Sequence, residues 1–85
     1  MKCWIYKGSA RQETYLFLPR ENDTRRVPSA LLDQLGALEL VMELTLSPER
    51  SLARANPIAV MNALEERGFY LQLPPPDAPG AERLQ

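Results

Sequence analysis

The sequence predicts a single α+β domain with elements in the order ββαβαβ, built as a mixed sheet of about four strands with helices packed on it. Residues 38–46 alternate large apolar side chains with Glu39, Val41, Glu43 and Thr45, a period of two that is typical of a strand. Two further segments begin at a proline and end at a glycine, as short helices do. The first two apolar segments are apolar on both faces, which favours cover on each side of the sheet.

The first two strands are expected at residues 3–7 and 14–18, which are rich in aromatic and branched side chains. A short turn containing Gly8 joins them, so they predict an antiparallel hairpin. Pro19 ends the second strand because it has no N–H to give to a ladder. The polar segment from Arg20 to Arg26 has no apolar period and is predicted to be a surface loop.

Two helices are expected to follow. The first lies between Val27 and Gly36, with Leu31, Leu32 and Leu35 on one side. Residues 38–46 form the strand that follows this helix, with all its leucines on one face. Residues 47–55 then connect that strand to the second helix. The second helix has Asn56 as its N-cap, Pro57 at its first position and Gly68 at its end. Its sheet-facing side chains are expected to be Ile58, Val60, Met61 and Leu64.

The last strand is predicted at residues 69–73 and is stopped by Pro74, Pro75 and Pro76. Phe69, Leu71 and Leu73 should point to one side, and Tyr70 and Gln72 to the other. The domain is expected to span residues 1–76. Residues 77–85, with proline, glycine and charge but only one large apolar side chain, are expected to form a flexible tail.

Several short stretches resemble one known family. They are residues 3–7 (Cys-Trp-Ile-Tyr-Lys), 14–16 (Thr-Tyr-Leu), 26–28 (Arg-Val-Pro) and 68–75 (Gly-Phe-Tyr-Leu-Gln-Leu-Pro-Pro). Together they make the sequence similar to the YcgL domain family, small bacterial proteins of uncharacterised function. The resemblance implies an α/β/α sandwich. It implies no activity, ligand or catalytic residue.

The composition argues against an enzyme and against a cofactor. The chain has 85 residues, one cysteine and no histidine, so no zinc site of the usual type can form within it, and Cys3 has no histidine to activate it. No glycine-rich phosphate loop is present, and a domain this small cannot enclose a cofactor cavity. We therefore expect no catalytic, cofactor-binding or metal-ligating residues, with Cys3 as a buried apolar side chain.

The default location is the cytoplasm, with no membrane partner. No apolar run approaches the roughly 20 residues that a membrane helix needs, and the first residues lack the apolar stretch of a secretory signal. A single cysteine gives no sign of an oxidising compartment.

Protein binding is the leading functional hypothesis, as an interaction or adaptor module. Its candidate residues are Tyr70 and Gln72 with the prolines Pro74, Pro75 and Pro76, which could form a polyproline ligand or simply end the strand. Self-association through an exposed sheet edge is a further option, which Glu39 and Glu43 would oppose.

Nucleic-acid binding is the alternative. The formal net charge is −1, but residues 2–26 carry +3. The candidate residues are Arg20, Arg25 and Arg26, near the hairpin aromatics Trp4, Tyr6, Tyr15 and Phe17, because basic and stacking groups together are how sheet-type RNA readers bind. Aromatics buried in the core would remove most of this case.

Overall fold

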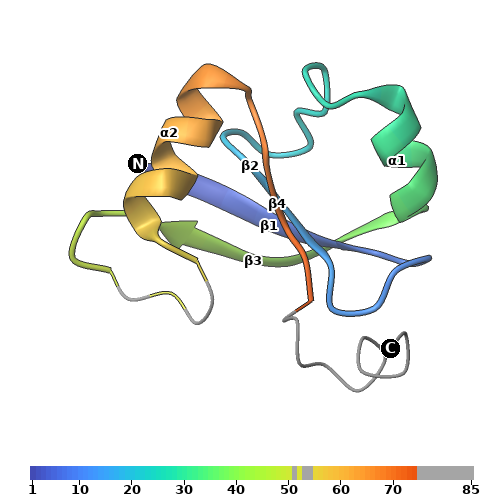
Figure 1. Cartoon of the computed structure of the whole chain (residues 1–85), viewed down its shortest axis with the longest axis horizontal. Coiled ribbons are helices and arrows are strands. Elements are labelled where there is room, and N and C mark those ends of the chain that lie inside the picture. Colours follow the sequence, from blue (N-terminus) through green and yellow to red (C-terminus); the bar gives the residue numbers. More distant parts are fainter. Residues whose placement is uncertain (51, 53–54, 75–85) are drawn as a thin grey trace, which may run out of the picture.

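The computed structural model describes residues 1–50, 52 and 55–74. In these residues four strands and two helices follow one another in the predicted order, ββαβαβ, and the α+β class is confirmed (Figure 1). The elements are β1 (Lys2–Gly8), β2 (Tyr15–Leu18), α1 (Ser29–Leu35), β3 (Leu38–Thr45), α2 (Pro57–Glu66) and β4 (Tyr70–Gln72). The predicted tail at 77–85 lies outside the described residues, as do Pro75 and Pro76.

The strands form one sheet in the order β3-β1-β2-β4, and all three pairings are antiparallel. The prediction of a mixed sheet is therefore wrong. After α1, strand β3 runs in the same direction as β2. It pairs with the edge of β1 that faces away from β2, however, so β1 lies between β2 and β3. The two parallel strands never become neighbours, so no parallel ladder forms.

The sheet is covered on both faces, as the α/β/α prediction requires. Successive residues of β1 alternate between two cores: Cys3 and Ile5 belong to the core under α2, and Tyr6 to the core under α1. In β2, Phe17 belongs to the α2 core, while Leu16 and Leu18 belong to the α1 core. The central hairpin is apolar on both sides because each side packs against its own helix, and Figure 1 shows the helices at opposite ends of the domain.

A β-bulge in β3 divides its leucines between the two cores. Ile5 is paired with Met42 and Tyr6 with Leu40, so Val41 has no partner on β1. Leu38 consequently packs in the α1 core, whereas Leu44 is buried in the α2 core. The prediction that these leucines share one face is wrong, because one extra residue reverses the alternation.

Helix α2 begins and ends where the sequence predicts. The Asn56 side chain accepts hydrogen bonds from the N–H groups of Ile58 and Ala59, at 2.8 and 3.4 Å. Val60 and Leu64 are buried and Met61 packs beside them. Ile58 is 49% exposed, contrary to prediction, because the sheet-facing stripe at spacings of three and four runs through positions 57, 60, 61 and 64.

Gly68 ends α2 with a φ of +85°, a conformation that costs residues with a Cβ about 1–2 kcal/mol. A Cβ there would also lie 2.6 Å from Cδ of Arg26. We expect Gly68→Ala to lower the free energy of unfolding by at least about 1–2 kcal/mol, measured by urea denaturation. Asn62→Ala, on the exposed side of α2, should change it little. Equal stability of Gly68→Ala and the parent would contradict this account of the helix end.

Candidate functional site

The loop that carries the predicted arginines is anchored to the α1 core. The buried Tyr6 hydroxyl accepts a hydrogen bond from the N–H of Asn22 at 2.8 Å. At the other end of the loop, the N–H of Val27 donates to the carbonyl of Thr24 at 3.0 Å, and Val27 itself is buried. A central strand thus fixes where the loop lies.

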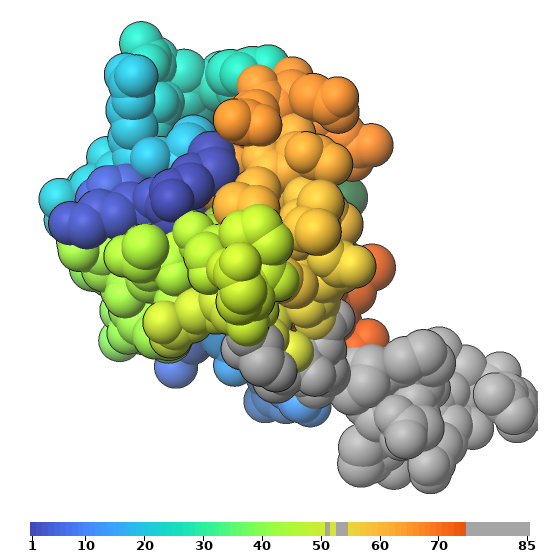
Figure 2. Space-filling model, turned by 90° about the vertical axis from the view of Figure 1, so that its left-hand side faces the viewer, coloured from blue at the N-terminus to red at the C-terminus, as the bar shows by residue number. Residues whose placement is uncertain are grey.

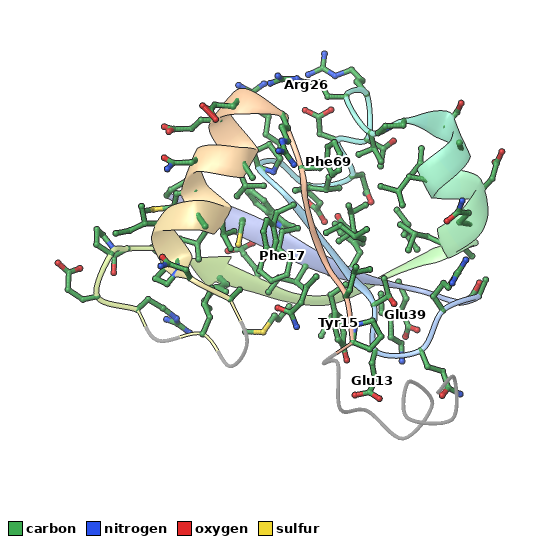
Figure 3. The ribbon with its side chains drawn as sticks, viewed as in Figure 1. Glu13, Tyr15, Phe17, Arg26, Glu39 and Phe69 are labelled. Carbon is green, nitrogen blue, oxygen red and sulfur yellow. The ribbon has the colours of Figure 1, made fainter. Side chains whose placement is uncertain are left out.

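Arg20, Arg25 and Arg26 line one hollow of about 270 Å³, together with Pro19, Asp23, Leu64 and Gly68. We call this the arginine hollow. The sequence prediction named these three arginines as a group, and the structure brings them together. Figure 3 shows Arg26 at the rim of the domain beside the end of α2.

Two of the three guanidinium groups already have partners. Arg25 donates to both carboxylate oxygens of Asp23, at 2.9 and 3.1 Å. These hydrogen bonds lower the pKa of Asp23 and raise that of Arg25. Arg26 donates to the carbonyl of Glu66 at the end of α2, where a cation also complements the helix dipole. The hollow keeps a positive excess, which suits an anionic group.

The residues around β4 mainly close the fold. The Tyr70 ring packs edge-on against Phe17, with ring centroids 5.5 Å apart and planes at 82°. Gln72 is paired with Tyr15 on β2. Phe69 and Leu71 pack in the other core, so the predicted alternation along this strand is confirmed for these residues. Pro74 is exposed, and the proline-ligand hypothesis remains a prediction.

The hairpin aromatics do not form a stacking surface. Tyr6 and Phe17 are each 3% exposed, and Trp4 and Tyr15 are half-buried against the two cores. Bases stack on exposed aromatic faces, and these four side chains do not offer such a surface. Base stacking on the hairpin is therefore not supported.

Cys3 is fully buried in the α2 core, as predicted. Burial raises the pKa of its thiol from 9.0 to about 11, against smaller opposing effects of the N-terminal ammonium and Arg50. Within the described residues no three histidine, cysteine or acidic side chains are grouped to hold a metal ion. None of the helices in that part of the chain has the length and apolar character to cross a bilayer.

The sequence analysis missed a run of three exposed apolar residues along the edge of the sheet. β3 is an edge strand, and its consecutive residues Leu40, Val41 and Met42 are 45%, 47% and 44% exposed. Glu39 and Glu43 stand at either side of them. We call these five residues the β3 edge. The sequence feature that could have indicated this exposure is an uninterrupted apolar triplet between two glutamates. The period of two in the same segment predicted a buried face of leucines instead.

The two glutamates are engaged by the neighbouring strand. Glu43 is 3.0 Å from the Lys2 ammonium, and Glu39 is 3.9 Å from that of Lys7. Both lysines belong to β1. Figure 2 shows the beginning of β1, in blue, between the residues that follow β3 and the loop that follows β2. Both ion pairs are exposed to solvent, so the two carboxylates also remain accessible to a strand that approaches this edge.

Comparison with known proteins gives the family. Residues 3–75 match the family model described as the YcgL domain. The chain belongs to the YcgL domain family. It is 43% identical over 75 residues to the YcgL domain-containing protein Smlt4554 of Stenotrophomonas maltophilia, covering 88% of this chain and 87% of that one. A YcgL domain-containing protein of Aeromonas hydrophila is 46% identical over 76 residues, covering 89% and 82%.

One relative has a different architecture. A Nitrosococcus oceani protein named putative HAD-like hydrolase is 49% identical over 71 residues, which are 84% of this chain but only 19% of that protein. The YcgL-like segment there is a small part of a much longer chain.

Burial of Cys3 predicts an unreactive thiol and a specific pH dependence. At pH 8 its modification by a disulfide reagent should be at least ~100-fold slower in the native protein than in the denatured chain. Above pH 9 the unfolded chain loses the proton that the native state keeps to about pH 11, so stability should fall as pH rises through this window. Across this window the Cys3 thiol should lower the free energy of unfolding by up to about 2–3 kcal/mol.

Cys3→Ala is the matched control for this measurement. Its stability should decline less steeply than that of the parent between pH 9 and pH 11, because it lacks the titrating thiol. Parallel declines, or rapid native modification, would show that Cys3 is accessible and not buried as described.

Proposed function

We propose that this chain is a small non-catalytic module that binds a partner protein through the β3 edge. The observation that carries the proposal is three consecutive exposed apolar residues, Leu40, Val41 and Met42, on a strand whose outer side is unpaired in the described part of the chain. An unpaired strand presents a row of N–H and C=O groups, and an extended segment of another chain can pair with them. The proposal places the module in the cytoplasm, where its single cysteine needs no disulfide partner.

The charges of the β3 edge indicate which segment would bind. The apolar triplet is flanked by Glu39 and Glu43, so a complementary strand is apolar at its centre and carries Lys or Arg at its flanks. A second copy of β3 fits poorly, because antiparallel pairing centred on Val41 would place Glu39 opposite Glu43 of the other copy. The partner is therefore a different protein.

The Nitrosococcus relative supports an interaction role. In that protein a YcgL-like segment is 19% of a longer chain named as a putative hydrolase. Linking two modules in one chain raises the effective concentration of one for the other, an arrangement that suits modules that bind. A YcgL domain that is not joined to its partner in one chain would bind that partner in trans.

Val41→Lys tests the proposal directly. A random-sequence peptide display library is selected on the parent protein, and the expected enrichment is for apolar segments flanked by Lys or Arg. Val41→Lys places a charge in the centre of the β3 edge and should reduce binding of the enriched peptides at least tenfold. Binding is measured by fluorescence anisotropy, with urea denaturation to verify folding.

Ile58→Lys is the matched control, since Ile58 is exposed to a similar degree, 49% against 47% for Val41, but lies on α2. It should keep full binding. Peptides that bind Val41→Lys as tightly as the parent would overturn the β3 edge as the binding surface. The part of the Nitrosococcus relative outside the match is a second probe in the same assay.

Binding of an anionic backbone such as RNA is the second candidate function. The observation in its favour is that Arg20, Arg25 and Arg26 line the same hollow. Phosphate contacts by arginines require no aromatic surface, so burial of the hairpin rings does not oppose this mode.

A salt titration of single-stranded RNA binding tests this candidate. Asp23 offsets one of the three arginines, so about two neutralised phosphates are expected, and the logarithm of the association constant should fall with a slope of about −1.4 against the logarithm of salt concentration. Replacing Arg20, Arg25 and Arg26 together by alanine should abolish the slope, whereas Arg50→Ala, outside the hollow, should leave it unchanged. Absence of binding at low salt, or binding that survives the triple substitution, would exclude the arginine hollow.

A further inference from the structure

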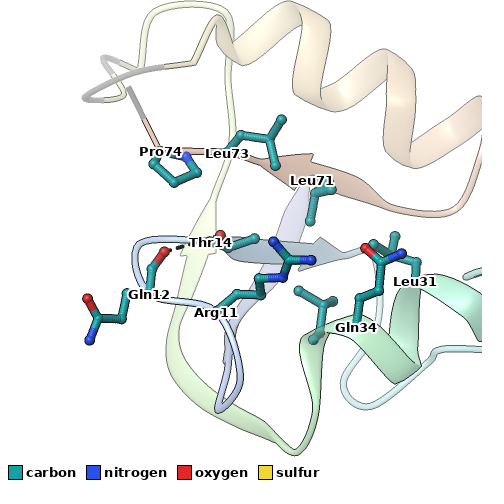
Figure 4. Close-up of a pocket in the computed structure, with 9 residues that line it drawn as sticks. Arg11, Gln12, Thr14, Leu31, Gln34, Leu71, Leu73 and Pro74 are labelled. Carbon is teal, nitrogen blue, oxygen red and sulfur yellow. Dashed lines mark hydrogen bonds between the residues drawn. The ribbon is translucent and has the colours of Figure 1, made fainter. Parts of the chain in front are cut away.

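A second hollow, of about 200 Å³, lies on the α1 side of the sheet, where α1, β4 and the turn between β1 and β2 meet (Figure 4). Helix α1 has only seven residues and so reaches about 10 Å, too short to cover the sheet to its end. Leu73 consequently remains 62% exposed, although it follows Leu71 in the strand pattern. We call this space the leucine hollow.

The walls of the leucine hollow are mainly apolar, and its polar groups come from the turn and from one helix residue. The apolar residues are Leu31, Leu35, Leu71, Leu73 and Pro74. The polar residues are Arg11, Gln12, Thr14 and Gln34. The Thr14 hydroxyl already donates to the carbonyl of Gln12 at 3.2 Å. A guanidinium and two carboxamides are left to bind a ligand.

Arg11 is the one cation of this hollow, and it forms no ion pair with any residue that the structure describes. Figure 4 shows its guanidinium group among the side chains of Thr14, Leu71 and Gln34. Arg11 also borders a more polar hollow with Lys7, Glu13 and Glu39, where Glu39 lies 3.9 Å from the Lys7 ammonium and Glu13 has an interaction of its own. Its donors are therefore available to an anion bound in the leucine hollow.

We propose that the leucine hollow binds an aliphatic carboxylate, with Arg11 holding the carboxylate and the leucines contacting the apolar chain. A planar guanidinium matches a carboxylate with two parallel hydrogen bonds, and Gln34 supplies a further donor. Phosphate fits less well, because five of the nine lining residues are apolar and only one is charged. The volume equals about seven waters, enough for a branched chain of four or five carbons.

The same chemistry is offered by a free short-chain acid and by a peptide whose last residue is leucine. Two probe pairs distinguish these sources: 4-methylpentanoate against its amide, and the tripeptide Ala-Ala-Leu with a free against an amidated C-terminus. Binding is followed by ¹H–¹⁵N NMR titration of the full chain at pH 7. The expected result is shifts confined to Arg11, Gln34 and Leu71 with the carboxylates, at least tenfold weaker for the amides.

Substitutions then separate recognition from folding. Arg11→Ala should weaken carboxylate binding at least tenfold without changing the urea midpoint, because Arg11 is exposed and has no ion pair in the described part of the chain. Leu73→Asp should have the same effect by repelling the ligand charge, and Arg50→Ala should have none.

A preference for the free acid over the tripeptide would identify a small-molecule site, and the reverse preference a peptide C-terminus site. Either preference supports the proposal. Equal binding of acids and amides, binding that survives Arg11→Ala, or no shifts at 20 mM of either carboxylate would overturn it. These results do not depend on the β3 edge, because the two surfaces share no residue.

Discussion

Strand β1 is the element on which the rest of the structure depends, because it is paired along both edges and covered on both faces. It lies between β2 and β3 in the sheet. On one face Cys3 and Ile5 join the α2 core, and on the other Tyr6 joins the α1 core. Two separate helices must therefore pack for this strand to be buried, which ties the halves of the chain into one cooperative unit. Its side chains also place the functional surfaces: the Tyr6 hydroxyl holds the arginine loop, and Lys2 and Lys7 hold the glutamates of the β3 edge.

The candidate binding surfaces lie where no other described element covers a sheet edge or a sheet face. In the described residues the sheet has four strands and so two edges, and the edge formed by β3 is left with three exposed apolar side chains. Two helices of seven and ten residues cannot cover the whole of both faces, and the leucine hollow is a gap that results on the α1 side. A small domain buries a limited share of its apolar surface, so exposed apolar groups are expected, and where several lie close together they offer a surface to another molecule.

Local signals in the sequence were sufficient for the elements and their order. The Asn56 cap and Gly68 fix the limits of α2, because each supplies a backbone conformation or hydrogen bond that few residues can. The double-sided apolar pattern of the hairpin correctly indicated two covering helices. The arginines also lie close together in sequence, so their convergence in one hollow follows from a single compact loop.

Long-range pairing decided what the sequence alone could not. The bulge at Val41 depends on how β3 aligns with β1, residues about 35 positions apart, and it reverses the faces of the leucines without any change in their spacing. Whether β3 lies at an edge depends on strand order, which no local pattern encodes. Arg11 and Leu73 likewise line one hollow only because β4 and the hairpin turn are brought together through the sheet. The sequence by itself determined the elements, their caps and the family. The tertiary structure decided which apolar and basic side chains remain available for binding, because that depends on which surfaces the finite sheet and its short helices leave uncovered.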